Sequence, residues 1–309
     1  MAHVWRAQDQ RGGAVAIKVL KLRRVEDAVQ RERFLREAEL AARVRHPNVV
    51  SIRAVGTERG HPWVAMELVE GIPFDDWLNN TQPSLDDVLD VIQQVLAGLQ
   101  AVHDAGIIHR DVKPTNVLVS TNGRVSAKLI DFGISVGPDL EDTDLTGRGM
   151  VVGSIPWMAP ERLQDSEASV QSDLYPVGLM LRQAVTGQKA FAGLTLLEMT
   201  DAIAKGMLAP LESTAPWLPE SLAVEIDRAC ATDPALRHPS AAAFRDSLCG
   251  LHQRLRTPVL GHIVGPQARR SSWFAVPSRP GAGPLLWVTV VGFVVLAASL
   301  IALIVERPA

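Results

Sequence analysis

The fold is most clearly indicated by one short segment, His109-Arg-Asp-Val-Lys-Pro-Thr-Asn116. It follows residues 85–106, whose apolar side chains recur at helical spacing behind a Ser-x-x-Asp capping box that starts at Ser84. It precedes a short predicted hairpin that turns at Asn122-Gly123. A carboxylic acid, a lysine and an amide are therefore expected close together on one loop between a helix and a hairpin.

Three further segments surround this loop in a fixed order. Val15-Ala-Ile-Lys18 lies in a β-rich run near the N-terminus, and Asp131-Phe-Gly133 and Ala159-Pro-Glu161 follow the loop. The four segments together resemble the signature of the protein kinase family, and the resemblance covers about residues 1–250. It implies an α+β fold with two lobes, a small β-rich N-terminal lobe and a large α-helical C-terminal lobe.

The expected elements agree with two such lobes. Residues 4–7 and 14–20 are predicted to form a hairpin, and a charged helix is expected over residues 27–44. Two more strands are predicted at residues 49–55 and 63–68. Beyond residue 84 the apolar spacing is mostly helical, so this part should form the large lobe.

The resemblance implies a Ser/Thr protein kinase that uses ATP and Mg²⁺ to phosphorylate protein substrates. Phosphoryl transfer requires the groups to be positioned and the phosphate charge to be neutralised. Asp111 would accept or orient the proton of the attacking hydroxyl, and Lys113 would contact the γ-phosphate. Asn116 and Asp131 would hold magnesium, because hard oxygen ligands suit this ion.

Nucleotide contacts are carried over from the same resemblance. Lys18 would bind the α- and β-phosphates, with Glu37 as its ion-pair partner and Glu39 as the alternative. Met66 matches the gatekeeper position, and Glu67 and Val69 would offer backbone groups to adenine. The remaining positions that match the nucleotide site are Val4, Ala16 and Leu118.

Four further residues match structural or activating positions of the family. The Ser154 hydroxyl is expected to bond the catalytic aspartate, and Lys113 with Ser154 favours Ser/Thr over Tyr as the phosphate acceptor. Glu161 should form a buried ion pair with Arg237, and Asp173 should anchor the backbone of the catalytic loop.

Thr146 is a candidate phosphorylation site in the activation loop. Its phosphate would pair with Arg110; the alternative is an ordinary solvated threonine.

The glycine-rich loop of the family is the main departure. Val4 matches the last residue of G-x-G-x-x-G-x-V, so the chain starts at Met1 with the first strand and most of the loop missing. Two explanations remain open. Either Met1 is not the true start, or the chain is a catalytically weak or dead kinase-fold scaffold at the membrane.

Residues 285–305 contain no charged side chain and are long enough to cross a bilayer as one helix, although a buried core helix is an alternative. Several arginines and no acidic residue precede them from residue 251 onward. This bias predicts a single-pass cell-membrane protein with its kinase domain in the cytoplasm. The expected domains are residues 1–252 (kinase), 253–284 (Pro/Gly/Arg linker), 285–305 (transmembrane helix) and 306–309 (extracytoplasmic tail).

The remaining composition restricts the partners. A net charge of −3 gives no basis for nucleic-acid binding. Cys230 and Cys249 are the only cysteines, and we expect small buried thiols in a reducing compartment. Ala298 and Ala302 have small-xxx-small spacing, which is compatible with a homodimer that phosphorylates itself in trans.

Overall fold

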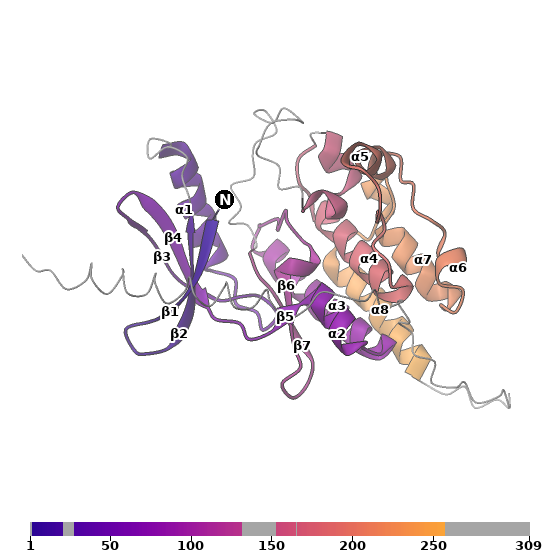
Figure 1. The fold of residues 1–309 in the computed structure, drawn as a ribbon, viewed down its shortest axis with the longest axis horizontal. Coiled ribbons are helices and arrows are strands. Elements are labelled where there is room, and N and C mark those ends of the chain that lie inside the picture. The colour runs from indigo at the N-terminus through magenta and orange to yellow at the C-terminus, as the bar shows by residue number, and fades with distance from the viewer. Residues whose placement is uncertain (1, 21–27, 132–152, 165, 257–309) are drawn as a thin grey trace, which may run out of the picture. The chain divides into compact units, whose positions relative to one another are not determined.

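The computed structural model describes residues 2–20, 28–131, 153–164 and 166–256 (Figure 1). The small lobe is an antiparallel sheet of order β1-β2-β4-β3 with one helix, α1. Their bounds are β1 Ala2–Gln8, β2 Ala14–Leu20, α1 Ala28–Ala41, β3 Ile52–Glu58 and β4 His61–Glu67. The predicted N-terminal hairpin is confirmed, and among the described strands β1 lies at an edge of this sheet.

The core of the small lobe forms where α1 packs against the sheet. Phe34, Ala38 and Ala41 recur on one helical face and are almost completely buried, as their spacing predicts. The predicted strand at residues 49–55 is wrong at its start, because β3 begins at Ile52. Val49 forms a parallel bridge with Leu129, and the amide of Val50 donates to the Leu129 carbonyl. This segment therefore bonds to the large lobe instead of extending β3.

The large lobe contains a three-stranded sheet of order β5-β6-β7 and most of the helices. In Figure 1, α3 lies beside both α4 and α8. The strands are β5 Ile72–Pro73, β6 Val117–Ser120 and β7 Ser126–Leu129. The helices are α2 Phe74–Thr81, α3 Leu85–Asp104, α4 Val170–Thr186, α5 Leu196–Ala204, α6 Leu211–Thr214, α7 Glu220–Ala229 and α8 Ala241–Arg256. Short 3₁₀ turns lie at Pro114–Asn116, Ile155–Trp157, Pro160–Gln164 and Pro234–Leu236.

Helix α3 is the centre of this lobe. Its predicted capping box is confirmed, since the Ser84 hydroxyl accepts the Asp87 amide and the Asp87 carboxylate accepts the Ser84 amide. The residues predicted to face the core are buried: Val91, Val95, Leu99 and Val102. This helix ends at Asp104, and residues 105–108 separate it from the loop of residues 109–116, so its burial helps to fix where that loop begins.

The C-terminal predictions lie mostly beyond the described part of the chain. Helix α8 continues to Arg256, four residues past the expected domain boundary at residue 252. None of the described helices is both long and apolar enough to cross a bilayer. The predicted span at residues 285–305 lies outside the described residues.

A glycine in α3 provides a test of this packing. A Cβ atom built on Gly98 would lie 2.8 Å from the Asn48 carbonyl oxygen and 3.1 Å from a Leu129 methyl group. Alanine normally stabilises a helix by about 1 kcal/mol relative to glycine. Because backbone lies in the way here, we expect Gly98→Ala to lower the free energy of unfolding by about 1–3 kcal/mol in a urea titration.

The matched control is Gly250→Ala in α8. Its new Cβ would meet only the end of the Arg254 side chain, at 3.5 Å. This variant should be as stable as the unaltered protein or more stable. Equal stabilisation by both alanines would contradict the close approach of α3 to residue 48.

Candidate active site

Asp173 holds the backbone of the catalytic loop, residues 109–116. It lies in the first turn of α4 and is buried. Its Oδ2 atom accepts the His109 amide at 2.7 Å, and its Oδ1 atom accepts the Arg110 amide at 2.9 Å. Arg110 has a φ of 68°, a left-handed conformation that is uncommon outside glycine. The prediction that Asp173 anchors this loop is confirmed.

The side chains of the loop converge on Asp111. Its Oδ2 atom accepts hydrogen bonds from Lys113 Nζ at 2.6 Å and from Asn116 Nδ2 at 3.0 Å. The same amide nitrogen donates to the Asp111 carbonyl at 2.8 Å. A quarter of the Asp111 side chain is exposed, so a substrate hydroxyl could reach the carboxylate.

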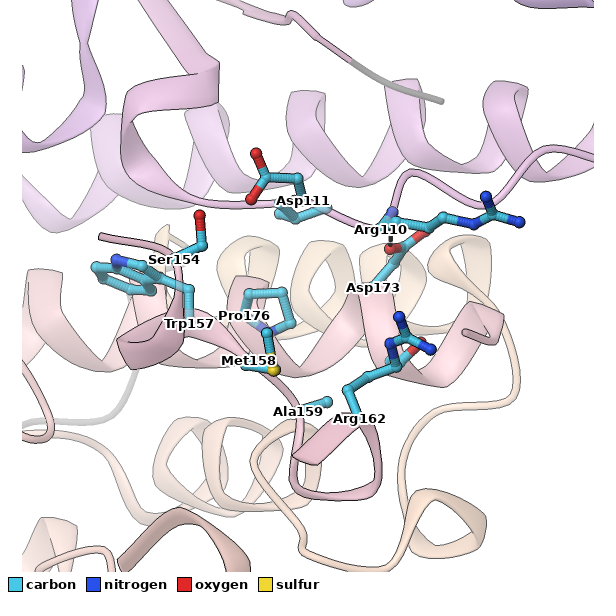
Figure 2. Close-up of a pocket in the computed structure, with 11 residues that line it drawn as sticks. Arg110, Asp111, Ser154, Trp157, Met158, Ala159, Arg162, Asp173 and Pro176 are labelled. Carbon is cyan, nitrogen blue, oxygen red and sulfur yellow. Dashed lines mark hydrogen bonds between the residues drawn. The ribbon is translucent and has the colours of Figure 1, made fainter. Parts of the chain in front are cut away.

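Ser154 is linked to Asp111 through the side chain of Lys113. Figure 2 shows Ser154 and Asp111 on the same side of a small pocket below the catalytic loop. Lys113 Nζ donates to the Ser154 hydroxyl at 2.7 Å while it is bonded to Asp111. The expected direct bond between Ser154 and Asp111 is absent from the hydrogen bonds of the described residues. The short lysine bridge takes its place, because an ammonium group has three donors and can serve both oxygens.

The two predicted metal ligands lie on adjoining segments. The Asn116 carbonyl accepts the Ile130 amide at 2.9 Å, which holds the end of the loop beside the residue that precedes Asp131. Since the Asn116 amide nitrogen is used by Asp111, the side-chain oxygen is the atom that it can offer a metal. An amide oxygen and a carboxylate suit magnesium, so these residues fit the expected ion. Phe132 and Gly133 lie outside the described residues.

The ion pairs of Lys18 and Glu37 differ from the expected pattern. Lys18 pairs with Asp131 at 3.1 Å, and Glu37 pairs with Arg110 at 3.2 Å. The expected Lys18–Glu37 pair is not among the ion pairs of the described residues. Lys18 is buried and needs a nearby counter-charge, which Asp131 supplies, whereas the half-exposed Arg110 side chain reaches Glu37.

The predicted adenine residues lie mostly on strands of the two sheets. Ala16 and Met66 are cross-strand partners in β2 and β4, and Val69 packs against the same core. Val4 lies opposite Lys18 in β1 and is largely exposed. Leu118 lies in β6, the strand that follows the catalytic loop.

Glu67 has a contact that the sequence did not predict. Its carboxylate accepts Lys128 Nζ at 2.6 Å and the Ser51 amide at 2.9 Å. Lys128 belongs to β7 in the large lobe, so this ion pair joins the two lobes beside the expected adenine site.

The buried ion pair between Glu161 and Arg237 is confirmed. The guanidinium donates to both carboxylate oxygens, at 2.8 and 2.7 Å, and Arg237 is fully buried. Its remaining donors reach the carbonyls of Ala231, Gln171 and Thr232, and its Cζ atom lies 4.9 Å from the centre of the Tyr175 ring. The pair thus joins the Ala-Pro-Glu segment to the start of α4 and to the segment before α8.

The contacts of two histidines, His109 and His103, were not predicted from the sequence. His109 is buried, and this burial lowers the pKa of its imidazole. Its Nδ1 atom accepts the Asp111 amide at 3.4 Å, which requires that nitrogen to be unprotonated. His103 bonds to Asp173, a contact between α3 and α4 that only the tertiary structure reveals. Thr146, the predicted phosphorylation site, lies outside the described residues.

The Arg237 site predicts a large effect from a conservative substitution. Lysine cannot reproduce the fork of donors that satisfies Glu161 and three carbonyls. We expect Arg237→Lys to lower the free energy of unfolding by about 2–4 kcal/mol in urea titrations. Arg245→Lys is the control, because Arg245 and its partner Asp246 are exposed, and it should change stability by less than about 0.5 kcal/mol. Similar small losses in both variants would show that the buried pair contributes little.

Known proteins resemble this chain in both sequence and fold. Residues 1–257 match the family model described as "Protein kinase domain". The chain is 35% identical over 285 residues to serine/threonine-protein kinase PknA of Mycobacterium tuberculosis, covering 90% of this chain and 64% of that protein. It is 35% identical over 236 residues to a probable serine/threonine-protein kinase PknB of Lactococcus lactis, covering 75% of this chain and 37% of that one.

The similarity extends to solved structures. The crystal structure of the PknI kinase domain of M. tuberculosis matches with a TM-score of 0.61 and 28% identity, over 81% of this chain and 90% of that one. The chain therefore spans about two thirds or less of the curated relatives named above but most of a solved kinase domain. On its matched residues 1–257, this chain belongs to the protein kinase family.

Proposed function

We propose that the chain is a Ser/Thr protein kinase that transfers the γ-phosphate of Mg-ATP to hydroxyl groups of cytoplasmic proteins. The observation that supports this most directly is the Lys113 ammonium, which bonds Asp111 and Ser154 at once. That arrangement places a carboxylate, a cation and a hydroxyl at one partly exposed point. The names of the relatives, both serine/threonine-protein kinases, point to the same reaction.

Each residue then has a distinct task in the transfer. Asp111 orients the substrate hydroxyl and takes its proton as the new P–O bond forms, while the bond from the γ-phosphorus to the β–γ bridging oxygen breaks and ADP leaves. Lys113 is placed to neutralise charge on the transferred phosphoryl group, and Ser154 helps to hold the lysine there. Lys18 would bind the α- and β-phosphates. Magnesium, held by Asn116 and Asp131, would neutralise phosphate charge.

One observation favours a second candidate, a kinase-fold scaffold with little activity. The carboxylate of Glu37 is bonded to Arg110, and Lys18 is bonded to a predicted metal ligand instead of Glu37. In this arrangement the predicted phosphate-binding lysine is engaged by Asp131. We prefer the enzyme, because Lys18 contacts Asp131 and Asn116 contacts Asp111, which supports a shared role for these four residues.

We also propose a membrane tether and a mode of regulation. The uncharged residues 285–305 and the arginines before them favour a single span with a cytoplasmic kinase domain. Such a span would bring two chains together and allow phosphorylation in trans. The candidate acceptor is Thr146, whose phosphate would compete with Glu37 for Arg110.

The activity predicts a specific loss in one variant. Asp111→Asn keeps the size of the side chain but removes the base, so we expect phosphate incorporation from labelled Mg-ATP to fall at least about a hundredfold. Asp246→Asn is the control because Asp246 is exposed and pairs with its neighbour Arg245. It should retain full incorporation. Equal incorporation by wild type and Asp111→Asn would exclude the proposed role of Asp111.

The tether predicts a different behaviour on fractionation. We expect the protein to stay with membranes after alkaline carbonate washing. Val294→Lys with Leu296→Lys should release it, because each central lysine costs about 3 kcal/mol in a membrane helix. The apolar pair Val294→Leu with Leu296→Val should remain bound. Release of the unaltered protein would contradict the span.

A further inference from the structure

We propose that His103 is a positioning residue for phosphoryl transfer, which acts by fixing the Asp173 carboxylate that holds the catalytic loop. The inference rests on the proposed kinase activity. His103 lies in the last turn of α3, and Asp173 lies in the first turn of α4. Both side chains are almost completely buried, and His103 Nε2 lies 2.9 Å from Asp173 Oδ2.

The direction of this hydrogen bond follows from the chemistry of its partners. Asp173 already accepts two backbone amides, so its oxygens act as acceptors. The imidazole must then donate from Nε2. Its other nitrogen, Nδ1, is buried and has no hydrogen-bond partner within the described residues. Leaving Nδ1 buried without a hydrogen bond is unfavourable. The bond from Nε2 to Asp173 is therefore the polar interaction that histidine makes at this position within the described residues.

The catalytic loop depends on an Asp173 carboxylate that is held in one orientation. The two backbone amides belong to the loop itself, so bonds to them alone would not fix the carboxylate relative to the rest of the large lobe. His103 belongs to a rigid helix and therefore fixes one oxygen relative to the body of the large lobe. That oxygen, Oδ2, is the one that also accepts the His109 amide.

The left-handed backbone at Arg110 explains why fixing the Asp173 carboxylate matters for the loop. A left-handed residue other than glycine persists only where its surroundings over-determine it. Asp173 Oδ1 supplies the bond to the Arg110 amide, and Asp111 is the next residue along the chain. Loss of the His103 donor should therefore displace Asp111. Most of the residues predicted to contact adenine lie on β2, β4 and β6, and Val69 follows β4; none of them hydrogen-bonds to His103 or Asp173 within the described residues.

The chain offers a closely matched control in His238. It too is buried, its Nε2 atom lies 2.7 Å from a carboxylate oxygen of Glu225, and its Nδ1 atom has no partner among the described residues. Glu225 belongs to α7, and the ring of His238 stacks on Phe244 of α8. The two histidines thus share their burial and bonding, and only His103 is connected to the catalytic loop.

The experiment compares both histidines in the full-length protein in native membranes. The variants are His103→Ala, His103→Gln, His103→Asn and His238→Ala, each assayed for kcat, for KM of ATP and for the fraction folded. Gln carries an N–H donor at the position of Nε2, whereas the Asn side chain is too short to reach Asp173. This pair keeps the test valid if His103→Ala does not fold.

We expect His103→Ala and His103→Asn to lower kcat per folded molecule at least about tenfold, with KM for ATP within about twofold of wild type. His103→Gln should recover most of the lost kcat. His238→Ala should lose stability but keep its kcat per folded molecule. A merely structural role for His103 would instead give the same kcat in all variants once the folded fraction is considered.

The results distinguish a failure of the positioning role of His103 from a failure of the proposed kinase function. An active wild type with unchanged kcat in His103→Asn, or with no difference between His103→Gln and His103→Asn, would overturn the positioning role alone. An increase in KM for ATP at constant kcat would also overturn it, because the effect would lie in nucleotide binding. A folded wild type that binds ATP but has no turnover would overturn the proposed function, and this inference with it.

Discussion

A buried carboxylate, that of Asp173, determines the shape of the catalytic loop. It is the common acceptor for the His109 and Arg110 amides and for the His103 imidazole. Burying a charged group is costly unless hydrogen bonds replace the lost water, and here three donors do so. The same bonds stabilise a left-handed backbone at Arg110, which directs the following residue, Asp111, toward Lys113 and Asn116. The positions of Asp111 and its partners therefore depend on a buried residue of α4.

The contacts between the two lobes are of a different kind. Lys18–Asp131, Glu37–Arg110 and Glu67–Lys128 are ion pairs with partly exposed carboxylates. The Glu37–Arg110 and Glu67–Lys128 pairs are partly exposed on both sides and should contribute little net free energy, typically under about 1 kcal/mol each, whereas Lys18 in the third pair is buried. The large lobe, by contrast, is held by buried pairs such as Glu161–Arg237. Two of the three charged contacts between the lobes are therefore weak, whereas the large lobe contains a buried pair that is costly to break.

The sequence predicted those features that depend on local pattern. The capping box at Ser84, the buried face of α3 and the N-terminal hairpin all follow from spacing along the chain. The kinase signature further predicted Asp173 as the loop anchor and the pair between Glu161 and Arg237.

The spacing of residues along the chain could not predict which charged side chains would form ion pairs with one another. Glu37 and Asp131 both lie within reach of cations in the cleft, and only the three-dimensional arrangement assigns Glu37 to Arg110. The Lys113 bridge to Ser154 and the start of β3 at Ile52 were missed for the same reason, since each depends on distant segments. His103 carries no local signal beyond its place near the end of a helix. A search for helix-end histidines that face a buried acid would have needed the fold first.

The most direct test of this account is the turnover of Asp173→Asn, measured alongside its affinity for ATP. An amide at residue 173 would replace one acceptor oxygen by an NH2 group, which cannot accept, where three donors require acceptors, so the loop should lose its geometry. The account predicts a folded protein with near-normal ATP affinity and a kcat lowered at least about a hundredfold. A folded Asp173→Asn variant with the kcat of the wild type would contradict the central role given to this carboxylate.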